Sequence, residues 1–78
     1  MAQEYKSTLF GRKLRGWRID SDKTQAELAA EIGIRQGTLS DWEIGKRMPR
    51  GAMLARMLKL IGADDGVRAA VFEEVAQR

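Results

Sequence analysis

The sequence contains no cysteine and no histidine, and a single proline interrupts its 78 residues. Without cysteine there is no disulfide, no thiol nucleophile and no thiolate metal site. Without histidine, the usual general base and a common zinc ligand are missing as well. These absences argue against most hydrolase and metalloenzyme chemistry. We therefore expect a protein that is not an enzyme and that holds neither a metal ion nor another cofactor.

Long apolar runs are also lacking. No run approaches the roughly 18 residues that would span a bilayer, and Met1 to Tyr5 contain no apolar segment like that of a secretory signal. We therefore expect a soluble cytoplasmic protein with no membrane partner. A chain of this length has room for one hydrophobic core, so residues 1–78 are predicted to form a single domain.

Acidic side chains are fewer than basic ones, and the difference lies in the first part of the chain. Residues 1–50 hold ten Lys and Arg against seven Asp and Glu, whereas residues 51–78 hold four of each. This distribution suits a polyanion as partner. The adjacent acids Asp64–Asp65 and Glu73–Glu74 do not read as catalytic pairs, because neighbours on a helix point about 100° apart. They are expected to be solvated charges at helix ends.

The spacing of the apolar residues predicts an all-α fold of five helices, because they recur at intervals of three and four residues. The first helix is expected to follow Ser7 as N-cap and to run to about Ile19. Thr24 and Glu27 predict a capping box at the start of the second helix. Gly33 ends that helix, since glycine adopts the left-handed conformation without penalty.

The third helix begins near Arg35 or Gln36 and ends before Gly45, with a buried side and a polar outer side. After a basic loop, an apolar stripe at i, i+4 spacing predicts a fourth helix that ends at Gly62. Asp64 or its neighbour caps a last helix at about residues 65–77. The apolar side of this helix consists of Val67, Ala70, Val71 and Val75, with Phe72 beside them.

The segment from Thr24 to Pro49 reads TQAELAAEIGIRQGTLSDWEIGKRMP and resembles the helix-turn-helix of the Cro and phage-repressor (XRE) family. With the flanking helices, the resemblance covers about residues 7–62. It implies a compact lambda-repressor-like helix-turn-helix domain that binds double-stranded DNA, with the third helix in the major groove. The resemblance rests on residues that stand at the family spacing: Gln25, Leu28, Ala29, Gly33, Leu39, Trp42, Glu43, Gly45 and Pro49.

The resemblance also implies roles for residues of the third helix. Gln36, Gly37 and Asp41 match the positions that contact bases, where a glutamine amide can form two hydrogen bonds with adenine. Arg35 stands where relatives carry a Ser or Thr cap, so it is expected to meet guanine or a phosphate instead. Asp41 either accepts from a cytosine amino group or pairs with a nearby arginine.

A second set of residues is expected to hold DNA phosphates, which adds affinity without sequence information. Gln25 begins the second helix, where an anion gains from the helix N-terminus. The alternative for each residue of this set is an ordinary solvated side chain. Three cations of the first helix, Arg12, Lys13 and Arg15, are not placed in the set, because a solvated position is the preferred interpretation for them. The other members lie on the third helix and the loop after it: Thr38, Ser40, Lys46, Arg47 and Arg50.

Two charged residues fall where the family has a structural ion pair. Arg18 matches the arginine and Glu43 the glutamate, so the pair is expected to tie the first helix to the end of the third. If the pair is partly buried, removing one partner leaves the other charge unpaired. Trp42 is expected in the core rather than stacked on a base.

The family resemblance implies a transcriptional regulator, most often a repressor, that binds a two-fold symmetric operator as a homodimer. The segment from Pro49 to Asp64 is also similar to HigA-like antitoxins, which implies an alternative role with a toxin as partner. A third interpretation is a protein adaptor without DNA binding, against which the basic loop and Gln36 argue. The candidates for the dimer contact, with packing inside one chain as the alternative, are Val67, Val71, Phe72 and Val75.

Overall fold

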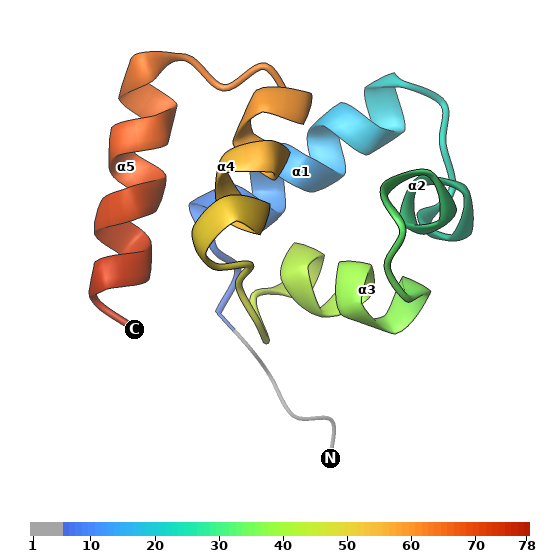
Figure 1. Ribbon diagram of the computed structural model, residues 1–78, viewed down its shortest axis with the longest axis horizontal. Helices are drawn as coiled ribbons and strands as arrows, with labels where there is room; N and C mark the ends of the chain where they lie inside the picture. Colours follow the sequence, from blue (N-terminus) through green and yellow to red (C-terminus); the bar gives the residue numbers. More distant parts are fainter. Residues whose placement is uncertain (1–5) are drawn as a thin grey trace.

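The computed structural model describes residues 6–78, which form five α-helices and no strand (Figure 1). This confirms the all-α prediction and the order of the helices. The expectation about a secretory signal concerns Met1 to Tyr5, which lie outside the described residues. Within the described part of the chain, no helix has the length and apolar character needed to cross a membrane. The helices are α1 (Leu9–Asp20), α2 (Gln25–Ile32), α3 (Gln36–Ile44), α4 (Gly51–Leu60) and α5 (Asp65–Ala76).

The start of α1 is capped by Thr8. The Thr8 hydroxyl accepts a hydrogen bond from the backbone N–H of Gly11 at 2.8 Å. The prediction of Ser7 as N-cap is therefore wrong by one residue. Thr8 is buried against the first turn of the helix, whereas the Ser7 hydroxyl accepts a hydrogen bond from the Arg12 side chain at 3.2 Å.

The caps of α2 and α5 agree with the sequence. Thr24 and Glu27 form the predicted capping box, in which each side chain accepts from the backbone N–H of the other, at 3.0 and 2.9 Å. Gly33 ends α2 in the left-handed conformation, with a φ of 78°. Asp64 caps α5 by accepting from the N–H of Val67 at 2.8 Å, so the first of the two predicted acids is the cap.

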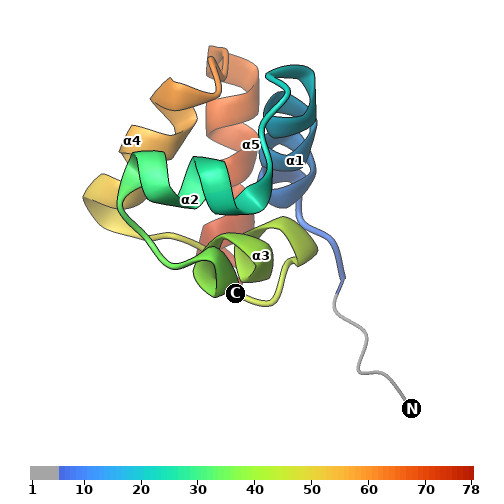
Figure 2. The ribbon, with the colours of Figure 1, turned by 90° about the vertical axis from the view of Figure 1, so that its right-hand side faces the viewer.

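The core is formed where α1 to α4 meet, and α5 packs on its flank (Figures 1 and 2). Phe10 of α1 and Trp42 of α3 meet edge to face, with ring centroids 6.3 Å apart. Trp42 is therefore a core residue, as predicted. The buried apolar residues come from all five helices: Phe10, Leu14, Leu28, Ala29, Ile32, Leu39, Trp42, Leu54, Met57, Leu58 and Val71.

α1 and α3 approach so closely that the contact requires a glycine. A Cβ atom added at Gly11 would lie 2.5 Å from the carbonyl oxygen of Trp42 and 2.7 Å from that of Glu43. Both oxygens belong to the backbone of α3, so they cannot rotate away as a side chain could. At Gly16, in the same helix, an added Cβ would meet nothing within 4 Å. Of these two α1 glycines, Gly11 alone is required by packing.

The C-terminal end of α5 contacts the start of α1. The carboxylate of Glu74 accepts from the N–H of Leu9 at 2.7 Å and from that of Phe10 at 3.2 Å. Glu74 therefore satisfies N–H groups that the first turn of a helix leaves without a partner. The prediction that Glu73–Glu74 are solvated charges is wrong for Glu74, because the fold brings it to α1 from 65 residues along the chain.

The apolar side of α5 also differs from the predicted dimer surface. Val71 is fully buried in the core, so the prediction that it contributes to a dimer contact is wrong. Val67 and Val75 are half-buried against the same core. Phe72 is 47% exposed and is the one large apolar side chain of α5 that faces outward.

Replacing Gly11 and Gly16 by alanine separates packing from helix propensity. Gly11→Ala is expected to lower the free energy of unfolding by about 2–3 kcal/mol, because α1 and α3 must move apart. Gly16→Ala is the matched control and should raise it by about 1 kcal/mol through helix propensity alone. Urea unfolding followed by circular dichroism measures both. Stabilisation by both substitutions would contradict the close approach of α1 and α3.

Glu74→Gln tests the contact between α5 and α1. The substitution keeps the shape but removes the charge and one acceptor, so we expect a loss of about 1–2 kcal/mol in unfolding free energy. Glu73→Gln on the same helix is the control and should change stability by less than about 0.5 kcal/mol, since Glu73 is exposed. Equal effects in urea unfolding would show that Glu74 does not cap α1.

Candidate nucleic-acid interface

α3 lies along one edge of the molecule, where no other helix of the described chain covers its outer side (Figures 1 and 2). At its start, Arg35, Gln36 and Gly37 are exposed. On its inner side, Leu39 and Trp42 are buried. The start of α3 is therefore accessible to a large partner as far as residues 6–78 are concerned, because none of their side chains covers it.

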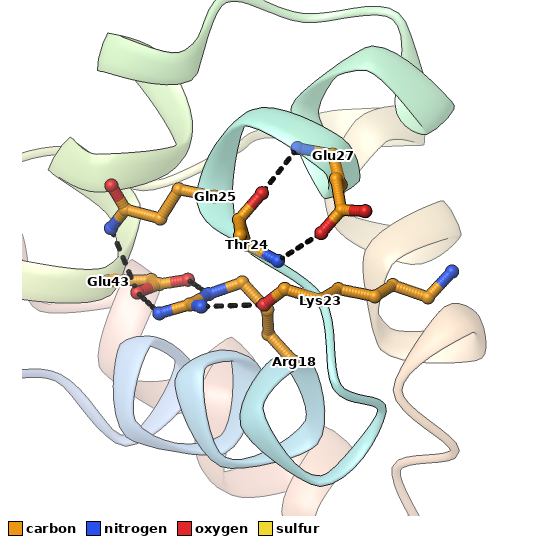
Figure 3. Close-up of polar contacts among 6 residues, drawn as sticks. All are labelled: Arg18, Lys23, Thr24, Gln25, Glu27 and Glu43. Atoms are coloured by element: carbon orange, nitrogen blue, oxygen red, sulfur yellow. Dashed lines mark hydrogen bonds and ion pairs between the residues drawn. The ribbon is translucent and has the colours of Figure 1, made fainter.

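Glu43, near the end of α3, is the centre of a polar network that joins α1, α2 and α3 (Figure 3). Its carboxylate accepts from Nε and Nη2 of Arg18, at 2.7 and 3.1 Å, and from Nε2 of Gln25 at 3.1 Å. Nη1 of Arg18 also donates to the carbonyl oxygen of Lys23 at 2.8 Å. The structure thus contains the expected ion pair and adds Gln25 to it.

This ion pair is largely shielded from water. The side chain of Glu43 is 3% exposed and that of Arg18 is 13% exposed. The hydrogen bond to Glu43 raises the pKa of the Arg18 guanidinium above its ordinary value, although partial burial opposes the shift. A charged pair with its hydrogen bonds satisfied holds α3 in a fixed position relative to α1 and α2.

The loop after α3 is basic and is anchored at Asp41. The carbonyl oxygen of Asp41 accepts from the N–H of Lys46 at 2.9 Å and from that of Arg47 at 3.2 Å. Its carboxylate lies 3.4 Å from Nε of Arg47. Of the two roles considered for Asp41, this geometry contains the pair with an arginine. Arg47 remains 68% exposed at its side chain, and Arg50 is exposed as well.

Two helices begin without a side-chain cap. Arg35 precedes α3 and Arg50 precedes α4, and neither makes a side-chain hydrogen bond to its helix. α1, α2 and α5, in contrast, are capped by their own side chains. The first N–H groups of a helix carry partial positive charge. The uncapped starts of α3 and α4, each next to an exposed arginine, therefore favour an anion.

The sequence profile of a helix-turn-helix domain family matches residues 9–71 of this chain. The chain belongs to this family. The match begins at the first residue of α1 and ends within α5, so it extends beyond residue 62, where the resemblance in the sequence stops. In this helix-turn-helix domain, α2 and α3 are joined by a tight turn at Gly33 and Ile34, where the N–H of Ile34 donates to the carbonyl of Ala29 at 3.0 Å.

A relative of the helix-turn-helix domain is an uncharacterized HTH-type transcriptional regulator of Archaeoglobus fulgidus. The two are 36% identical over 58 residues, which is 74% of this chain. The matched segment is 25% of the relative, so the chain spans about a quarter of that protein's length.

The remaining residues predicted to hold phosphate lie at the same edge as α3 or beside it. Thr38 and Ser40 are half-buried on α3, and Gln25 is half-buried at the start of α2 with its amide engaged by Glu43. Their contacts with phosphate stay predictions. Among residues 6–78, no group of acids lies close enough to form a metal site.

Three contacts of the domain have no counterpart in the sequence-based predictions. They are the bond from Gln25 to Glu43, the cap that Glu74 provides for α1, and the bond from Nη2 of Arg78 to the carbonyl of Gly45 at 3.1 Å. Each joins residues at least 18 positions apart. Local spacing carries no signal for such contacts.

Glu43→Gln tests the network at the end of α3. Because Arg18 would lose its charged partner in a shielded position, we expect the unfolding free energy to fall by about 3 kcal/mol. Glu31→Gln is the control, since its pair with Lys23 at 2.6 Å is exposed and is worth less than about 1 kcal/mol. Urea unfolding compares the two. A loss at Glu43 no larger than that at Glu31 would rule out the network as a structural support.

Proposed function

We propose that this helix-turn-helix domain is a non-enzymatic, sequence-specific regulator of transcription that binds double-stranded DNA and acts as a repressor of the Cro and phage-repressor type. The observation that carries the proposal is the exposed start of α3, which follows the exposed Arg35 and has no side-chain cap. The relative from Archaeoglobus fulgidus, which is named as a transcriptional regulator, supports the same function.

In the proposed complex, the start of α3 enters the major groove, which is wide enough for an α-helix. The amide of Gln36 forms two hydrogen bonds with an adenine, and Gly37 lets the backbone come close to the bases. Arg35 contacts a guanine or a phosphate. Asp41 acts through Arg47, whose guanidinium it orients at 3.4 Å, rather than by meeting the DNA as an isolated negative charge.

Phosphates on either side of the groove are held by the uncapped helix starts and by the basic loop. Backbone N–H groups at a helix start bind phosphate oxygens, and nearby arginines add charge. The basic loop runs from the end of α3 to the start of α4, and Arg47 and Arg50 of this loop line the same hollow. In the proposed complex, Arg47 and Arg50 contact the same DNA backbone. These contacts supply affinity and little sequence preference.

The proposed operator is two-fold symmetric and is bound by a dimer, with half-site centres about 34 Å apart so that both recognition helices enter the groove on one face of the DNA. An antitoxin role remains an alternative that rests on the segment from Pro49 to Asp64. Leu54, Met57 and Leu58 of that segment are buried in the core, which accounts for their spacing without a toxin. A purely adaptor protein would show no affinity for duplex DNA at low salt.

Gln36→Ala and Arg50→Ala separate base reading from phosphate contact. Selection from random duplexes should show that Gln36→Ala relaxes the preference at one base position, at a cost of about 1–3 kcal/mol for the preferred sequence. Arg50→Ala should weaken binding to all sequences alike and make the log–log salt slope shallower by about 0.9.

Lys13→Ala, an exposed cation on α1, is the control and should leave both measurements unchanged. If Gln36→Ala and Arg50→Ala weaken every sequence equally, α3 does not read the bases through Gln36. If the unmodified chain has no affinity for duplex DNA at low salt, the proposed function fails.

A further inference from the structure

A hollow of about 700 Å³ lies between the C-terminal half of α5, the start of α4 and the basic loop. Its apolar surface is provided by Met48, Leu54, Phe72 and Val75, and its charged surface by Lys46, Arg47, Arg50 and Arg78. None of the described residues that line the hollow is a carboxylate. An apolar surface and positive charge are thus combined at one place.

The C-terminal end of α5 is fixed by two contacts. Glu74 binds the start of α1, and Arg78, just after the helix, donates to the carbonyl oxygen of Gly45 at the end of α3. Phe72 lies shortly before these two residues on α5 and remains 47% exposed. Burying such a ring on binding a partner is favourable at roughly 25 cal/mol per Å². Because α5 is already fixed, little ordering of the chain is needed for binding.

Three kinds of molecule could occupy this hollow: a second copy of the chain, DNA or a peptide. The positive charge of its lining favours one of them. A two-fold contact with a second copy centred here would bring two sets of cations together, and like charges across an interface are unfavourable. A DNA backbone would meet the cations but would leave Phe72 and Met48 uncovered. A peptide with apolar anchors flanked by carboxylates satisfies both surfaces at once.

We propose that the hollow lined by Phe72, Met48, Arg50 and Arg78 is a docking site for an acidic, amphipathic peptide segment of a partner protein. One or two aliphatic or aromatic side chains of the segment pack on Phe72, and neighbouring Asp or Glu residues meet Arg50 and Arg78. Since Arg50 and Arg47 are also the proposed phosphate contacts, the peptide and DNA compete. This competition rests on the proposed function, whereas binding of the peptide does not.

Selection of short random peptides on the full chain tests the site. The enriched sequences are expected to combine Asp or Glu with aromatic or aliphatic residues. A labelled peptide from this set, followed by fluorescence anisotropy, should lose about tenfold in affinity for Phe72→Ala. Ile19→Ala is the matched control, since Ile19 is 52% exposed and lies outside the hollow, and it should bind like the unmodified chain. Enriched peptides without acidic residues, or equal affinities of the two variants, would overturn the proposal.

Measurements with duplex DNA distinguish the proposed peptide site from the proposed DNA-binding function. A duplex should displace the labelled peptide from the unmodified chain, Arg50→Ala should weaken both ligands, and Phe72→Ala should weaken the peptide alone. Peptide binding without any duplex affinity would remove the proposed function and leave the docking site standing. Simultaneous binding of both ligands would overturn the competition. Sedimentation that reveals a dimer lost in Phe72→Ala would overturn the peptide site, because a second copy would then be the occupant.

Discussion

The arrangement of the helices depends on the shielded ion pair between Arg18 and Glu43. One carboxylate at the end of α3 receives two bonds from α1 and one from the start of α2, at 2.7 to 3.1 Å. Such a pair adds little net stability over apolar packing, yet it penalises any arrangement that leaves one charge unpaired. Together with the close contact at Gly11, the ion pair fixes how α3 packs against α1.

The five helices differ in whether a side chain caps their first turn. Where Thr8, Thr24 and Asp64 cap their helices, the first N–H groups are satisfied from within. Where Arg35 and Arg50 take the cap position, the N–H groups and the partial charge of the helix face outward. Uncapped helix starts next to exposed arginines are the features that favour an anion, and they need no dedicated pocket.

α5 links this edge to the rest of the molecule. Val71 fastens the helix to the core, Glu74 fastens it to the start of α1, and Arg78 reaches the carbonyl of Gly45 at the end of α3. The C-terminal end of the chain is therefore in direct contact with the end of α3. α5 also builds one wall of the hollow beside the basic loop, so Phe72 and Val75 of this helix lie at the same hollow as Arg47 and Arg50.

The sequence by itself determined what depends on neighbouring residues. Apolar spacing located the five helices, the Thr24–Glu27 pair marked the start of α2, and Gly33 marked its end. The pairing of Arg18 with Glu43, 25 residues apart, was implied by the family resemblance alone. Only the tertiary structure decided that Glu74 caps α1, that Val71 is buried, that Gly11 is required by α3 while Gly16 is not, and that Arg78 meets Gly45. The reason is physical: capping and helix periodicity act within a few residues, whereas these contacts join segments that approach only when the helices pack.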